Sequence, residues 1–188
     1  MGTTSAAALG IDPGKVDMLE EQLAGGVLWP GSNGYEEARS IWNGMIDKHP
    51  GLIVRPAGVA DVMRTVEFAR GHELPLAIRG GGHNVAGLAV SDGGLMLDMR
   101  SMRSVQVDPQ AQTAYVQGGA TWADFDRETG VFDLATTGGV ISTTGVAGLT
   151  LGGGVGWLVG KHGLSIDNLL SVDLVTAYGE FITASEHN

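Results

Sequence analysis

The stretch Ala77-Ile-Arg-Gly-Gly-Gly-His-Asn84 joins a short apolar segment to three successive glycines and a histidine. Residues 75 to 78 predict a strand that runs straight into the glycines. Successive glycines after a strand can turn several backbone N–H groups into one concavity, which binds anions. Arg79 could add charge from the flank, and His83 would lie beside whatever is bound, as a neutral imidazole nucleophile. Taken alone, the loop is also compatible with a tight turn whose histidine bonds its own backbone.

The segments around this loop predict an α+β chain. Residues 52 to 55 form an expected strand ended by Pro56, and residues 59 to 70 show helical apolar spacing closed by Gly71. Together with the strand at 75 to 78 they predict a βαβ crossover. The other expected helices cover 13–23, 35–42 and 121–128, with Asp12 and Thr121 as N-caps, and the other expected strands cover 95–98, 104–107, 113–117, 170–177 and 180–183.

Composition narrows the class of partner. A formal charge of -10 argues against nucleic acid and against an anionic membrane surface, so a ligand phosphate would have to be held by backbone amides. The chain has 31 glycines and no cysteine, which excludes disulfides and thiolate metal sites. Residues 1 to 12 predict a loose arm without the pattern of a signal peptide, and no stretch has the length of a membrane span. We therefore expect a cytoplasmic protein.

Other nucleotide and metal motifs fit poorly. Gly154-Val-Gly156 begins a dinucleotide fingerprint, but the sixth position is Val159, and Gly160-Lys161 lacks the remainder of a P-loop. The five histidines show no metal-ligand spacing, and no nucleophile elbow is present. Several other side chains are assigned structural roles. Trp122 and Trp157 are expected in the core, although Trp157 could instead line a cofactor. His162 is expected in a turn, and Asp167 and Asn168 are expected to cap or turn the chain before the last strands.

Seven motifs fall in the order typical of the vanillyl-alcohol-oxidase-like fold, also called the PCMH-type FAD-binding fold. They are Leu52-Ile-Val-Arg-Pro56, Ala77 to Asn84, Gly93-Gly-Leu-Met-Leu-Asp98, Gly118-Gly-Ala-Thr-Trp122, Gly145-Val-Ala-Gly-Leu-Thr-Leu-Gly-Gly-Gly154, Lys161-His-Gly-Leu-Ser-Ile-Asp-Asn168 and Val175-Thr-Ala177. Within that fold, residues 35 to 188 resemble the berberine-bridge-enzyme-like oxidases. The resemblance implies an arm and helix in 1–34 and a FAD-binding domain in 35–188. That domain would combine a small N-terminal βαβ subdomain with a second mixed α+β subdomain, truncated before the substrate domain.

The resemblance also assigns site residues. Arg79, Gly80, Gly81, Gly82, His83 and Asn84 match the family's pyrophosphate loop, and His83 falls on the histidine that bonds the 8α-methyl carbon of the flavin. Val140, Thr143, Thr144, Gly145 and Gly148 match the second FAD loop, and Ile182 falls near the adenine end. Some relatives add a second bond from a cysteine, but Ile141 stands near that position here. The catalytic bases of relatives lie outside the matched portion, so we expect no catalytic residue and no metal ligand in this chain.

The activity implied by the resemblance is that of an FAD-dependent oxidase. A hydride would pass from a small organic substrate, an alcohol, sugar or amine, to N5 of covalently held FAD, and dioxygen would take up the electrons. The alternative is a non-catalytic or vestigial FAD-binding fragment without turnover.

Overall fold

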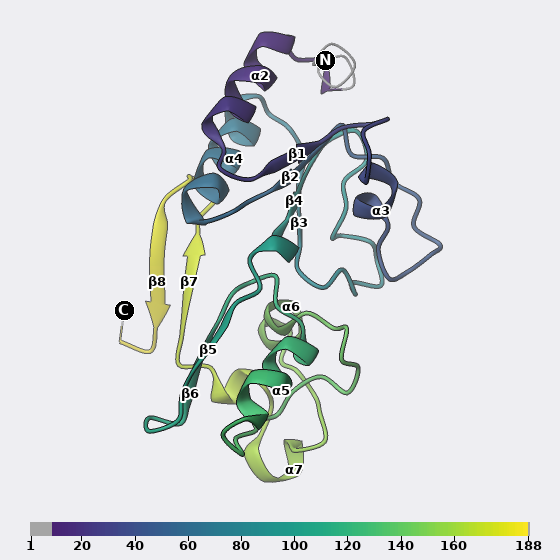
Figure 1. The fold of residues 1–188 in the computed structure, drawn as a ribbon. Coiled ribbons are helices and arrows are strands. Elements are labelled where there is room, and N and C mark those ends of the chain that lie inside the picture. Colours follow the sequence, from purple (N-terminus) through teal and green to yellow (C-terminus); the bar gives the residue numbers. More distant parts are fainter. Residues whose placement is uncertain (1–8, 188) are drawn as a thin grey trace.

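The computed structural model describes residues 9 to 187, which form a sheet-and-helix region and a second region of hairpins and short helices (Figure 1). The elements are α2 (Pro13–Gln22), β1 (Gly26–Leu28), α3 (Tyr35–Arg39), β2 (Leu52–Arg55), α4 (Val59–Gly71), β3 (Leu76–Arg79), β4 (Leu95–Asp98), η1 (Met99–Ser101), β5 (Val105–Asp108), β6 (Thr113–Val116), α5 (Trp122–Gly130), α6 (Val146–Leu151), α7 (Val159–His162), η2 (Ile166–Asn168), β7 (Ser171–Val175) and β8 (Phe181–Ser185).

The first region is a four-stranded sheet in the order β1-β2-β4-β3. Strands β2, β4 and β3 run parallel, and β1 pairs antiparallel with β2. Helix α4 connects β2 to β3, so the predicted βαβ crossover is confirmed, with β4 inserted between its two strands. All three parallel strands end at the same edge of the sheet, where the glycine loop begins.

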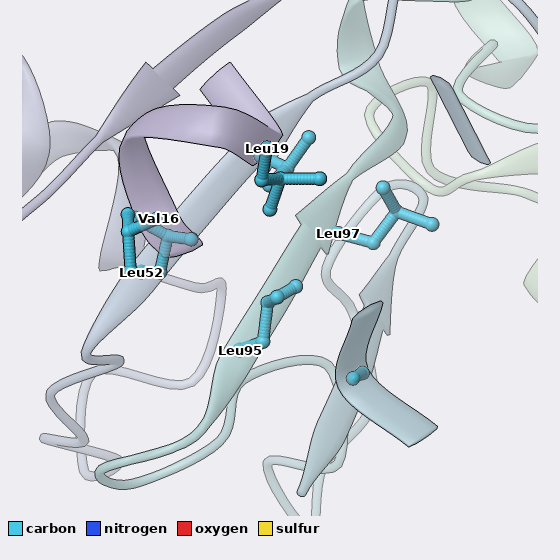
Figure 2. Packing of buried hydrophobic residues seen from close by; sticks show 7 residues of the cluster. Val16, Leu19, Leu52, Leu95 and Leu97 are labelled. Carbon is cyan, nitrogen blue, oxygen red and sulfur yellow. The ribbon is translucent and has the colours of Figure 1, made fainter. Parts of the chain in front are cut away.

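The central strands β2 and β4 are buried on both faces, and their successive side chains are all apolar up to the last residue. On one face the strands pack against Val16 and Leu19 of α2 (Figure 2) and against Ala69 of α4. On the other face they pack against Tyr35 and Ala38 of α3. The strand residues are Leu52, Val54, Leu95 and Leu97 on the first face and Ile53 and Met96 on the second.

The second region begins with the antiparallel hairpin β5–β6 and continues into α5. Helix α5 starts with a capping box, in which the Thr121 hydroxyl accepts from the Asp124 N–H and the Asp124 carboxylate accepts from the Thr121 N–H. The predicted cap and the predicted burial of Trp122 are both confirmed, since Trp122 is 2% exposed and packs edge-on against Phe125.

The hairpin β7–β8 lies beside α4 (Figure 1), and its turn rests on that helix. Gly179 has a φ of 83°, and a Cβ at this residue would come within 2.7 Å of the Glu67 side chain. The Arg70 guanidinium lies 6.0 Å above the centre of the Tyr178 ring. The Tyr178-Gly179 turn, which connects β7 to β8, therefore packs against α4 and holds this hairpin against the first region.

Three predictions about local structure need correction. The helix expected over 35–42 ends at Arg39, because the Trp42 N–H donates to the Gly82 carbonyl at 3.2 Å instead of continuing the helix. The short strand β1 was not expected, since Gly25-Gly26 was assigned only a helix-stopping role. Trp157 is 84% exposed rather than packed in the core. Its neighbour Gly156 makes the close contact there, because a Cβ would lie 1.8 Å from the Gly138 carbonyl oxygen.

The glycine-dense stretch also contains the short helices α6 and α7. His162 was predicted to lie in a turn but is the last residue of α7, because its N–H donates to the Leu158 carbonyl at 2.9 Å. Asp167 and Asn168 have the predicted structural role: the carboxylate accepts from the Leu164 N–H, and the amide donates to the His162 and Leu164 carbonyls. Of the arm predicted over residues 1 to 12, the first eight residues lie outside the described part. Within residues 9 to 187, no helix is long and apolar enough to cross a membrane.

Candidate functional site

The loop after β3 lies at the edge of the sheet where the parallel strands end. Gly82 takes a φ of 74°, a conformation that favours glycine, and its carbonyl accepts from the Trp42 N–H. The N–H groups of Gly81, Gly82, His83 and Asn84 have no acceptor among the described residues. Four successive free N–H groups form the kind of donor array that binds an anion.

Arg79, the last residue of β3, lies beneath this loop. Its side chain is 6% exposed and donates a hydrogen bond to the Ala38 carbonyl at the end of α3. Burial, followed by repulsion from Arg100, lowers the pKa of its guanidinium to about 10, although Asp98 opposes the shift. The Nε atom is buried and has no partner among residues 9 to 187. The structure thus places Arg79 as a support between α3 and the loop, with its charge directed inward.

Asp98 balances the positive charge at this edge. It pairs in register with Arg79 of β3, and its carboxylate accepts two 2.8 Å hydrogen bonds from Arg100. The Arg55 Nε lies 3.5 Å from the same carboxylate. Burial acts to raise the pKa of Asp98, but the bonds and charge of Arg100 outweigh it and hold the pKa below its ordinary value. This cluster fixes the ends of the strands from which the loop departs.

His83 is held from two sides. Its ring stacks on Trp42, with centroids 5.4 Å apart and 19° between the planes, and its Nε2 lies 3.0 Å from the Thr143 hydroxyl oxygen. Burial lowers the pKa of the imidazole below its ordinary value, against an opposing contribution from a hydrogen bond with the Thr143 backbone. The ring is therefore neutral at physiological pH and has a defined orientation.

The second predicted loop meets the first at two glycines. A Cβ on Gly81 would come within 2.2 Å of the Gly145 nitrogen, and a Cβ on Gly145 within 2.5 Å of the Gly81 nitrogen. The second loop is itself held to the start of α5, since the Trp122 N–H donates to the Thr144 carbonyl at 3.0 Å. Within the described chain, the N–H groups of Ile141 and Thr143 have no acceptor either. The two glycine loops therefore bring two sets of free donors to one place.

The remaining predicted residues are distributed as follows. Gly80 follows β3, the Asn84 side chain accepts from the Leu88 N–H, Val140 is about half exposed, and Gly148 lies in α6. Ile182 lies on β8 and pairs with Leu174, so it belongs to a separate sheet and to neither loop. The structure brings together residues 79–84 and 140–148 and places Ile182 in the β7–β8 hairpin.

Trp42 is the residue of this site that sequence reasoning missed. It lies 41 positions before His83, on a segment expected to be helical, and no periodicity links the two. The sequence offered one weak signal, which is that Trp42 is an aromatic residue shortly after the helix that buries Tyr35 and Ala38.

Two clefts lie away from the glycine loops. One of about 280 Å³ is lined by η2 and the β7–β8 hairpin, and one of about 490 Å³ lies between α2 and α4. Neither is lined by the glycine loops. Among the described residues, no cluster of His, Asp or Glu could hold a metal ion.

Comparison with known proteins agrees with this geometry. A family model described as an FAD binding domain matches residues 50–185. The chain is 38% identical over 164 residues to (R)-6-hydroxynicotine oxidase of Paenarthrobacter nicotinovorans. The aligned residues make up 87% of this chain and 36% of that protein. The crystal structure of 6-hydroxy-D-nicotine oxidase from Arthrobacter nicotinovorans matches with a TM-score of 0.86 and 38% identity, over 88% of this chain and 36% of that one.

A BBE-like protein of Physcomitrella patens matches with a TM-score of 0.84 and 31% identity, over 90% of this chain and 37% of that one. The chain thus spans little more than a third of the length of the relatives it matches. Within that span the resemblance inferred from the motif order is confirmed. The chain belongs to the family of FAD-binding domains found in FAD-linked oxidoreductases.

Proposed function

We propose that this chain supplies the FAD-binding part of an oxidase that acts on a small organic substrate. One observation carries the proposal: the two glycine loops meet at Gly81 and Gly145, and each offers backbone N–H groups without acceptors. A protein of net charge -10 with so few cations can hold a pyrophosphate mainly through such donors. The residues present therefore fit FAD.

The loops would divide the work of binding. In the loop that begins at Gly80, the free N–H groups of Gly81, Gly82 and Asn84 would donate to the pyrophosphate. In the loop from Val140 to Gly148, those of Ile141 and Thr143 would donate from the other side. Arg79 would act through the loop that it supports, since its side chain is directed toward Ala38. We keep Ile182 as a proposed contact at the adenine end on the resemblance alone.

His83 would tether the cofactor. Its pKa is lowered and its ring stacks on Trp42, which supports a neutral, oriented imidazole within the donor array. The role of tether is carried over from the resemblance to the family. A second tether from the other loop is impossible because the chain has no cysteine, and Ile141 stands near that position. Attachment, where it occurs, is through His83 alone.

When bound, FAD would supply the acceptor for one hydride, which carries two electrons, from the substrate, and dioxygen is the proposed final acceptor. Relatives carry names such as (R)-6-hydroxynicotine oxidase and chitooligosaccharide oxidase. We accordingly propose an amine, alcohol or sugar as the substrate class. In this activity the chain's own residues bind and orient the cofactor.

The organisation of the chain remains a proposal as well. We divide it into an arm and helix over 1–34 and a FAD-binding domain over 35–188, and we propose a cytoplasmic location. A second candidate function is FAD binding without turnover, since the two glycine loops supply donors for a cofactor and none of the residues proposed here is assigned a catalytic role.

The test is reconstitution with FAD followed by acid denaturation. We expect yellow colour that stays with the protein band, loss of covalent flavin in His83→Ala, and no change in His162→Ala, whose side chain is exposed at the end of α7. Peroxide release with a panel of amines, alcohols and sugars then separates an oxidase from a binding domain. A chain that stays colourless after incubation with FAD contradicts both candidate functions.

A further inference from the structure

The cleft between α2 and α4 is the larger of the two clefts described and has no part in the proposed FAD site. Its walls are one face of each helix, since the lining residues recur at intervals of three and four. These residues are Lys15, Met18, Leu19 and Gln22 from α2, and Arg64, Glu67, Phe68 and His72 from α4 and its C-cap. The volume of about 490 Å³ lies within the range of about 300–1,000 Å³ that is common for sites of small molecules.

The middle of this cleft is apolar and partly aromatic. Leu19 belongs to the core beneath it, and Phe68 packs against the same core. Met18 leaves 59% of its surface exposed, and the rings of Phe68 and His72 are in contact, with centroids 4.4 Å apart. An aromatic group in the cleft would bury the surface of Met18 and pack beside this ring pair.

The charges that line the cleft favour an anion. Two cations, Lys15 and Arg64, lie on it, and Glu67 is the one acidic residue that lines it within the described chain. The Glu67 side chain lies against the β7–β8 turn, because a Cβ at Gly179 would meet its Cγ at 2.7 Å and its Oε1 at 3.2 Å. The net charge of -10 repels an anion at long range, but salt screens that repulsion beyond about 8 Å. The local cations therefore decide which charge is attracted.

The two cations differ in what they contact. The Arg64 Nη1 donates to the Gln22 carbonyl at 3.1 Å and so joins α4 to the end of α2. The Lys15 ammonium has no hydrogen bond or ion pair with any residue from 9 to 187. Lys15 comes seven residues before Gln22, about 10 Å away along α2. The unpaired ammonium and the joining guanidinium thus lie at opposite ends of the α2 wall, with Met18 and Leu19 between them.

We propose that this cleft binds a small carboxylate with an aromatic body. The carboxylate would pair with Lys15 Nζ, and the ring would lie over Met18 beside the Phe68–His72 pair. A single ammonium is a point charge without a fork of donors, which suits a monoanion. Arg64 keeps the cleft in shape by holding α2 to α4. Because the ligand would contact two helices and neither glycine loop, this inference adds a second site and does not rest on FAD binding.

Two probes of matched shape test the site in the full chain without FAD. We expect 4-phenylbutyrate to bind with a Kd of about 1 mM, as for a ligand of few atoms. It should shift ¹H–¹⁵N signals of α2 and α4 and leave those of residues 79–84 in place, and it should raise Tm. The neutral 4-phenyl-1-butanol should bind about two- to fivefold more weakly. Equal binding of the two probes, or no saturable shift with 4-phenylbutyrate, overturns the proposal.

Variants of Lys15 test the pairing with the carboxylate. Lys15→Gln should weaken 4-phenylbutyrate about two- to fivefold and leave the alcohol unchanged, whereas Lys15→Arg should bind both probes like the wild type. Lys161→Gln is the matched control, because this exposed residue of α7 carries the same charge far along the chain. An equal loss in Lys161→Gln and Lys15→Gln would be an effect of net charge alone and would overturn the site.

Two further variants locate the body of the ligand. Met18→Gln replaces an exposed apolar side chain with a polar one of similar length, so it should weaken both probes without unfolding the chain. Arg64→Gln should change the affinity for both probes by the same factor, because the guanidinium is assigned to the joint between the helices. A loss confined to 4-phenylbutyrate in Arg64→Gln places the carboxylate at the other end of the cleft and overturns the assignment. Wild-type affinities in Met18→Gln also overturn it.

Discussion

Gly81→Ala should separate the two glycine loops. The added Cβ would lie 2.2 Å from the Gly145 nitrogen, 2.7 Å from its Cα and 3.1 Å from the Thr143 carbonyl oxygen. All three atoms belong to the backbone, so no side-chain rotation can relieve the overlap. Ordinary contact begins near 3.4 Å, and the loops must therefore move apart by about 1 Å.

The size of the effect follows from that displacement. Overpacking of this kind costs about 1–3 kcal/mol of unfolding free energy, and for a chain of this length each kcal/mol lowers Tm by roughly 2–4 °C. Movement of the second loop by about 1 Å would also stretch the 3.0 Å bond between His83 and Thr143 beyond hydrogen-bonding range.

Calorimetry and the ¹⁵N signal of His83 measure the two effects. Gly160→Ala is the matched control, because a Cβ there meets nothing within 4 Å and the residue lies in α7. The control should melt at the wild-type temperature or slightly above it. If Gly81→Ala melts with the wild type and leaves the ¹⁵N signal of His83 unchanged, the two backbones are not in the contact described, and the reasoning is refuted.

Three further predictions concern the supports of the site. Asp98→Asn should lower the unfolding free energy by about 2–3 kcal/mol in urea titrations, because it leaves Arg100 without its charged partner. This loss is smaller than that expected for a fully buried ion pair, since the Arg100 side chain is 34% exposed. A change below about 0.5 kcal/mol would count against the cluster. The pKa of Asp98 is lower in the folded state than its ordinary value of 3.8. The stabilisation that its carboxylate provides should therefore be fully present above pH 3.8 and be lost as the pH falls through the lower folded-state pKa. Acid titrations of the wild type and Asp98→Asn compare the two stabilities. Thr121→Ala should cost about 1 kcal/mol through loss of the capping box, with Thr121→Ser near wild type in the same titrations.

Much of the fold follows from local pattern. Helix α4 and strands β2 and β4 were predicted within one residue, because their apolar periodicity and their Pro and Gly boundaries all agree. The short strand β1 had no such signal: it has three residues, begins with a glycine, and exists because its backbone pairs with β2. Helix α6, with Gly148 in its interior, is also poorly favoured by local propensity.

The site divides in the same way. The order of motifs placed both glycine loops, since each glycine run is visible in the sequence. What they do together could not be predicted, because the Gly81–Gly145 contact and the stack of Trp42 on His83 join segments far apart in the chain. Arg79 illustrates the limit: its type suggested a ligand contact, whereas its burial beneath the loop is a property of the tertiary fold.

The inserted position of β4 also orders the events of synthesis. Strands β2 and β3 each find their parallel partner only in Leu95–Asp98, which is made after both. As the chain leaves the ribosome, the antiparallel β1–β2 pair is the single pairing of this sheet that can precede that point. The glycine loop between β3 and β4 is therefore translated before the sheet that will hold it exists, and it acquires its shape only when the central strand closes the gap.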